Sequence, residues 1–121
     1  MRTVKFRIFD SEIKKYIDIS ASAIMLDELN NLKPNLKIEQ FTGLYDKNGK
    51  EIYEGDIVSY KRNVGNWTGK SLTTVHEIIF TEEINAFVMK DNSGYIKLRK
   101  HWGYEYEVIG NIHENAELLN N

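Results

Sequence analysis

Cysteine is absent from the 121 residues of this chain. Its absence excludes disulfides, thiolate catalysis and zinc or iron–sulfur sites held by cysteine, and it fits a reducing cytoplasm. No run of apolar residues approaches the length of a membrane span, and the charged start MRTVKFR lacks the apolar region of a signal peptide. We therefore expect a soluble protein that is not exported and stays in the cytoplasm of its cell.

A large excess of one charge is also missing, because the formal net charge is -2. The global electrostatic footprint of a nucleic-acid-binding protein is therefore absent. Arginine is scarce beside lysine, and arginine is the better bidentate ligand of phosphate, so this composition weakens a nucleic-acid function. The length suits one domain, which would bury about two-thirds of its unfolded surface.

Signatures of metal and phosphate sites are missing as well. The histidines His76, His101 and His113 have no partner four residues away and form no HExxH motif, so we predict no metal site and no cofactor. Residues 65–71, GNWTGKS, are one residue short of the phosphate-loop spacing, and no helical pattern follows them. No serine lies in a GxSxG motif.

Three carboxylates, Glu51, Glu54 and Asp56, lie close together in the sequence. Paired carboxylates can perform acid–base catalysis, but at a turn they more simply accept backbone hydrogen bonds. Nothing nearby in the sequence marks a cleft or a raised pKa. We predict that these residues shape a turn and that the protein is not an enzyme.

Residues 40–58, QFTGLYDKNGKEIYEGDIV, have the densest local chemistry in the chain. Residues 37–41 alternate polar and apolar side chains as a half-buried strand does, and residues 46–49 have the composition of a hairpin turn. Gly55, just before a new alternating strand, is expected at a position where a side chain would clash or where φ must be positive. The residues predicted to determine the turns of the fold are Gly43, Gly49, Gly55 and Asp56.

The same stretch carries a family resemblance. FTGL followed by DKNGKEIYEGDIV resembles the signature of the YopX family, and the start VKFRIFD and the end VIGNIHENAELL resemble that family's termini. The departures are Phe9, His113 and Ala116, where Trp, Tyr and Pro are usual. The resemblance implies a mainly β fold with an SH3-like barrel, an origin in a phage or prophage, and a function that is unassigned.

The pattern along the chain predicts a single domain over residues 1–121, mainly β with little helix. Residues 1–20 read as an amino-terminal hairpin, residues 22–33 as a short helix, residues 36–110 as the barrel and residues 111–121 as a terminal turn or tail. The helix is interpreted as a cover for the core, with docking of a partner as the alternative. Residues 61–71 are polar and without periodicity, which predicts a loop.

Positive charge concentrates near Arg7, after Tyr60 and around Arg99. The last two groups are interleaved with aromatic residues, and a barrel with such a surface can stack bases and follow the phosphates of a single strand. Such aromatic residues are equally typical of a core. The candidate contacts are Lys61, Arg62, Trp67, Lys70, Lys97, Arg99, Lys100 and Trp102.

A protein-interaction module is the competing hypothesis, and we place it slightly ahead of nucleic acid. SH3-like barrels bind peptides through aromatic grooves and exposed edges, and Trp67 in the polar segment is its best candidate anchor. The expected partner is a protein of the host or of the phage, and self-association through sheet edges is a variant. The sequence thus predicts a non-enzymatic accessory protein that binds a macromolecule and no membrane.

Overall fold

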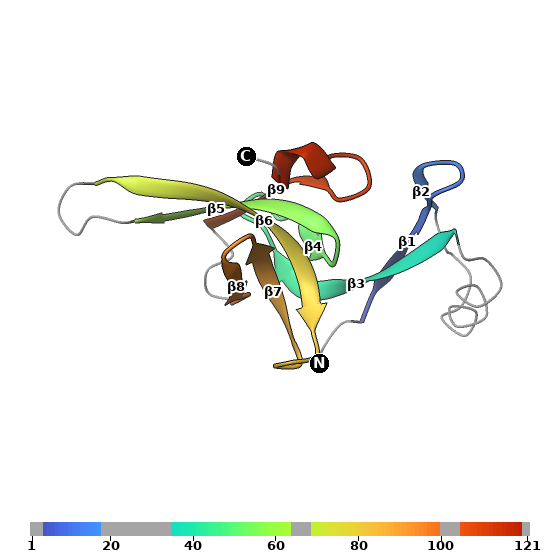
Figure 1. Ribbon diagram of the computed structural model, residues 1–121, viewed down its shortest axis with the longest axis horizontal. Helices are drawn as coiled ribbons and strands as arrows, with labels where there is room; N and C mark the ends of the chain where they lie inside the picture. The colour runs from blue at the N-terminus through green and yellow to red at the C-terminus, as the bar shows by residue number, and fades with distance from the viewer. Residues whose placement is uncertain (1–3, 18–34, 64–68, 100–104, 120–121) are drawn as a thin grey trace. The chain divides into compact units, whose positions relative to one another are not determined.

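The computed structural model describes residues 4–17, 35–63, 69–99 and 105–119 (Figure 1). The chain divides into two compact units, Met1–Phe41 and Thr42–Asn121. The single domain expected from the sequence stays a prediction, and the expected helix over residues 22–33 lies outside the described residues. No helix in the described part of the chain is long and apolar enough to span a membrane. The described elements are β1 (Phe6–Asp10), β2 (Lys15–Ile17), β3 (Leu36–Tyr45), β4 (Glu51–Tyr53), β5 (Asp56–Asn63), β6 (Ser71–Thr81), β7 (Ala86–Asp91), β8 (Gly94–Lys97), β9 (Tyr106–Asn111) and the 3-10 helix η3 (Ala116–Leu119).

The first unit contains the hairpin expected at the amino terminus. β1 pairs antiparallel with β2 and, on its other side, with the start of β3. Arg7 belongs to one of the concentrations of positive charge seen in the sequence, and its Nε donates to Oε1 of the buried Glu39 at 2.8 Å. The Tyr16 hydroxyl donates to the same oxygen at 2.9 Å. A buried carboxylate needs such partners, so Arg7 is a structural cation.

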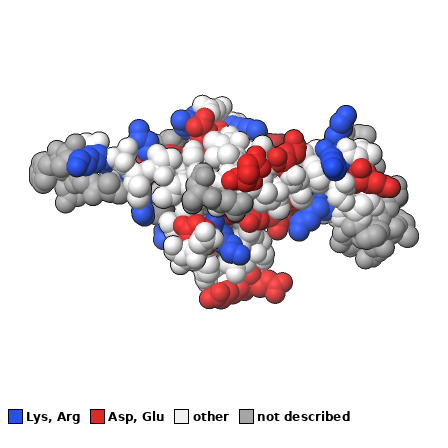
Figure 2. All heavy atoms as spheres, turned by 45° about the horizontal axis from the view of Figure 1, so that its top comes forward, with Lys and Arg blue, Asp and Glu red and all other residues white. Residues whose placement is uncertain are grey.

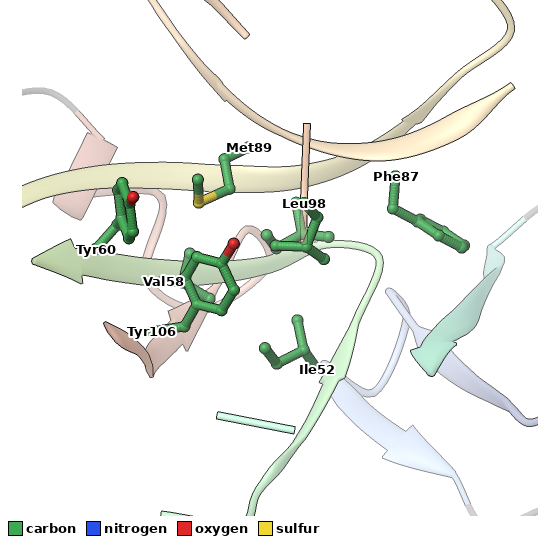
Figure 3. Packing of buried hydrophobic residues seen from close by; sticks show 8 residues of the cluster. Ile52, Val58, Tyr60, Phe87, Met89, Leu98 and Tyr106 are labelled. Carbon is green, nitrogen blue, oxygen red and sulfur yellow. The ribbon is translucent and has the colours of Figure 1, made fainter. Parts of the chain in front are cut away.

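The second unit is built on a five-stranded antiparallel sheet in the order β8-β7-β6-β5-β9, curled into a half-barrel. This confirms the mainly β fold expected from the sequence. Its concave face holds the main cluster of buried side chains, several of which converge in Figure 3. Tyr60 and Tyr106 pack there with their ring centroids 5.4 Å apart. The buried members are Ile52, Val58, Tyr60, Ile78, Phe87, Met89, Leu98 and Tyr106.

Three of the glycines chosen from the sequence have a positive φ, although Gly43 lies within β3 and not in a turn. Gly43, Gly49 and Gly55 have φ values of 88°, 80° and 88°, a region that L side chains rarely adopt. The Gly55 N–H donates to the Ile78 carbonyl at 2.8 Å, which holds this bend against β6. Asp56 Oδ2 accepts the Tyr53 N–H at 2.7 Å, so this carboxylate shapes the turn as predicted.

Asp46 joins two parts of the second unit that are distant in the sequence. It is buried, and its Oδ1 accepts the N–H groups of Asn48 and Lys50 at 2.8 and 2.9 Å within the β3–β4 turn. Its Oδ2 accepts the Val108 N–H of β9 at 2.9 Å. The Lys47 N–H adds a bond to the Tyr106 carbonyl at 2.9 Å. The turn therefore covers the outer edge of β9.

Candidate functional site

A cleft of about 680 Å³ lies along β6, next to the β7–β8 turn and η3. It exists because β7 is shorter than β6. The β6–β7 ladder begins at the pair Glu77↔Lys90, whereas β6 starts at Ser71 and pairs with β5 from there. The lining residues are Thr73, Thr74, Val75, Glu77, Lys90, Asp91, Asn92, Ser93, Leu118 and Leu119.

Local hydrogen bonds position two walls of the cleft, the β7–β8 turn and η3. Asp91 Oδ1 accepts the Ser93 N–H at 2.8 Å, a side-chain turn that reverses the chain after β7. The opposite wall is η3, which is held close to the end of β9 by the Asn115 N–H bonded to the Asn111 carbonyl at 2.8 Å. Gly110 is needed at this point, since a Cβ there would lie 2.5 Å from Oδ1 of Asn115.

The edge of β6 in this cleft has no β partner among the described residues. The Ile78 carbonyl points to the β5 side, where it accepts the Gly55 N–H. Backbone directions alternate along a strand, so the N–H and C=O groups of Thr73 and Val75 point to the other side, into the space that β7 does not reach. The cleft is therefore bordered by unpaired strand backbone.

Thr74, His76 and Asp91 form a polar cluster beside this cleft. Thr74 Oγ1 lies 2.6 Å from His76 Nε2, and His76 Nδ1 lies 3.5 Å from Asp91 Oδ2. The imidazole is 1% exposed, and its Nδ1 has no hydrogen-bond partner in the described part of the chain. Burial lowers the pKa of His76, the Asp91 carboxylate raises it and Arg62 lowers it, and the net direction is downward.

The cluster has the hydroxyl, imidazole, carboxylate order of a hydrolase triad. However, the contact between Nδ1 and Oδ2 is too long for a hydrogen bond, and the ring is enclosed by Tyr60 and the sheet. We interpret the cluster as a buried polar contact between β6 and the end of β7. Within the described ranges there is no group of three or more His, Cys, Asp or Glu residues that could hold a metal ion.

The candidate contacts chosen from the sequence fall into separate places. Lys61 and Arg62 are exposed near the end of β5, and Lys70 is exposed just before β6. Lys97 is exposed on the edge strand β8, and Arg99 is exposed just after it, its N–H donating to the Tyr106 hydroxyl at 3.2 Å. Trp67, Lys100 and Trp102 lie outside the described residues.

The first of these groups lies on a two-stranded ribbon, where the sequence predicted a loop. β5 continues to Asn63 and β6 begins at Ser71, because the pairs Lys61↔Thr73, Arg62↔Leu72 and Asn63↔Ser71 extend the ladder. We call residues 61–63 and 70–73 the basic arm. It is at the left of Figure 1, and in the view of Figure 2 it carries blue but no red side chains.

The cleft residues were missed in the sequence, although one signal was present. Thr74 and His76 are two residues apart in a strand and so share a face, which brings their side chains together. The cleft itself depends on the different lengths of β6 and β7 and on the position of η3, and no local pattern reports these.

The YopX protein family matches residues 5–120 of the chain. Among solved structures, the chain is similar to protein EF1440 from Enterococcus faecalis, with 27% identity, a TM-score of 0.65, and coverage of 98% of this chain and 99% of that one. A comparison with curated proteins found no match. Because the family match spans nearly the whole sequence, the chain belongs to the YopX family.

Proposed function

We propose that this protein is a non-enzymatic accessory protein of a phage or prophage that acts as a protein-interaction module in the cytoplasm of the bacterial host. It binds an extended segment of a partner protein as an added strand along the open edge of β6. The observation that carries this proposal is the cleft bordered by the backbone of Thr73 and Val75. Membership of the YopX family supports the phage or prophage origin.

An added strand suits this edge for two reasons. Unpaired N–H and C=O groups supply main-chain hydrogen bonds, which give affinity in strand addition. The added strand would continue the line of β7 past Asp91, at the spacing of neighbouring strands of about 4.8 Å. The bend held by Asp91 and Ser93 keeps the chain's own β8 out of that space.

The walls of the cleft define the side chains that the partner segment presents. Leu118 and Leu119 are half-buried and apolar, and they face β6 from η3. Thr74, Asn92 and Ser93 offer hydroxyl and amide groups elsewhere in the lining. Successive side chains of a strand point to opposite faces. The expected ligand is a segment that alternates aliphatic and polar residues, with its aliphatic side against Leu118 and Leu119.

Two proline substitutions test whether the backbone of β6 forms the edge that binds the partner segment. In Val75→Pro the missing N–H faces the cleft, so the protein should keep its fold. The bound strand would lose one hydrogen bond and would clash with the proline ring. In Thr74→Pro the missing N–H faces β5, so this matched variant should be destabilised. Melting of both variants by circular dichroism checks the assignment of the edge before any binding is measured.

Binding is then measured with peptides of about ten residues selected from a random displayed library, a length that matches a strand. We expect the selected peptides to bind the wild type saturably, to lose at least tenfold in affinity for Val75→Pro and Leu119→Ser, and to retain affinity for Ile84→Ser. Ile84 is the control because it is an exposed aliphatic residue in the β6–β7 turn. Equal affinity for Val75→Pro would refute the proposal. A wild-type dimer that Val75→Pro dissociates would identify the occupant as a second copy of this chain instead.

A further inference from the structure

The basic arm is a ribbon of two strands that extends past the rest of the five-stranded sheet. The β5–β9 ladder ends at Tyr60↔Tyr106, and the β6–β7 ladder begins at Glu77↔Lys90. Beyond these pairs the two strands of the arm have only each other as ladder partners among the described residues. A two-stranded ribbon is marginally stable by itself and buries little apolar surface, so its side chains contribute little to the core.

The charge of the arm differs from that of the chain. Lys61, Arg62 and Lys70 supply three cations, and no Asp or Glu occurs between Asp56 and Glu77, while the whole chain has a net charge of -2. Clustered cations attract polyanions, and no carboxylate within this stretch of the sequence weakens their field. The arm therefore carries a local positive charge on a chain that is negative as a whole.

The geometry of the arm indicates which kind of polyanion it can bind. Lys61 and Arg62 are consecutive in a strand, so their side chains leave opposite faces of the ribbon. Cations on both faces can contact the two phosphate backbones that border a groove. The major groove of B-form DNA is wide enough for a two-stranded β-ribbon, whereas the major groove of A-form RNA is narrow and deep.

We propose that the basic arm binds duplex DNA by entering the major groove, with Lys61, Arg62 and Lys70 on the phosphates. The exposed hydroxyls of Ser71 and Thr73 lie on the same ribbon and supply further hydrogen bonds. This function is additional to the binding of a protein segment, and the two sites share Thr73, whose backbone borders the cleft and whose hydroxyl lies on the arm. Three phosphate contacts give weak, sequence-independent affinity, in the range of about 10⁻⁴ to 10⁻⁶ M.

Fluorescence anisotropy with a labelled mixed-sequence duplex of about two helical turns, roughly 20 base pairs, tests this proposal. With three phosphate contacts, the affinity of the wild type should fall about 40-fold between about 50 and about 200 mM salt. The variant K61A/R62A/K70A should lose most of the affinity and most of this salt dependence. The matched control K15A/K37A/K50A removes the same charge from exposed positions outside the arm and should bind nearly as the wild type does.

Circular dichroism of both triple variants checks that they are folded, and the single substitution Lys70→Glu repeats the test outside the paired strands. Lys70→Glu should weaken binding more than Lys50→Glu does. Val75→Pro should leave DNA binding unchanged, which separates this proposal from the binding of a protein segment. Absence of binding by the wild type at about 50 mM salt, or equal losses in the arm and control variants, would overturn the proposal. Tighter binding of a single strand or of duplex RNA would overturn the assignment to the major groove.

Discussion

Removal of the Asp46 carboxylate should strongly destabilise the second unit. Asp46→Ala deletes the acceptor of three backbone N–H groups, those of Asn48, Lys50 and Val108. Asn48 and Lys50 are exposed, so water can replace the carboxylate there at a cost of about 1 kcal/mol each. The Val108 N–H lies in the half-buried edge of β9, and leaving it unpaired costs about 1–3 kcal/mol. The expected loss of unfolding free energy is about 3–5 kcal/mol.

Urea denaturation followed by circular dichroism measures this loss, and the melting temperature should fall by about 4 °C for each kcal/mol in a chain of this size. Asp46→Asn retains one acceptor oxygen and should lose about half as much, because its amide group cannot accept a hydrogen bond. Asp91→Ala is the matched control, since Asp91 accepts the Ser93 N–H in a similar turn at the surface. If Asp46→Ala loses no more than Asp91→Ala, the bond to Val108 does not hold β9 and the reasoning is refuted.

Three further predictions concern single positions. Gly55→Val should lower the stability by more than about 2 kcal/mol, because φ is 88° there and a β-branched side chain is strained in that region, and an unchanged urea midpoint would contradict it. Because the pKa of His76 is lowered in the folded state, its contribution to stability is complete above the unfolded pKa of about 6.5 and is lost as the pH falls below that value. His76→Gln should therefore flatten the dependence of unfolding free energy on pH between about pH 7 and pH 5 relative to the wild type. Burial raises the pKa of Tyr106 to about 12, so its stabilising effect is present below about pH 10 and is lost as the pH rises through 12. Tyr106→Phe should remove that alkaline loss, and a profile equal to that of the wild type would place the loss on other groups.

Much of the fold could be predicted because it depends on neighbours in the sequence. Gly55 followed by Asp56, the turn after Tyr45 and the alternation in β1 and β3 are local chemistry, and each appears where it was expected. The loop predicted over residues 61–71 is wrong because the structure there depends on pairing between two strands and not on neighbours in the sequence. Lys61, Arg62 and Asn63 have no apolar alternation, and they are strand because each pairs with a residue of β6.

The candidate site was predicted only in part. The cations of the basic arm were chosen from the sequence because the charge of each residue can be read directly. The sequence did not show that these residues lie on one two-stranded ribbon. Glu39 gave no sign of burial in the sequence, since an ionisable residue enters a core only when a partner is present, and its partner Arg7 is distant in the chain. His76 lies near Thr74 in the sequence, but its burial depends on the assembled sheet.

The class of fold, the family and the bends follow from the sequence, because turn residues and alternating side chains act over a few positions. The tertiary structure alone decided that β6 extends beyond β7, that Asp46 closes the edge of β9 and that a cleft opens beside η3. These features depend on the lengths and contacts of strands far apart in the chain, which is why they appear only once the sheet is assembled.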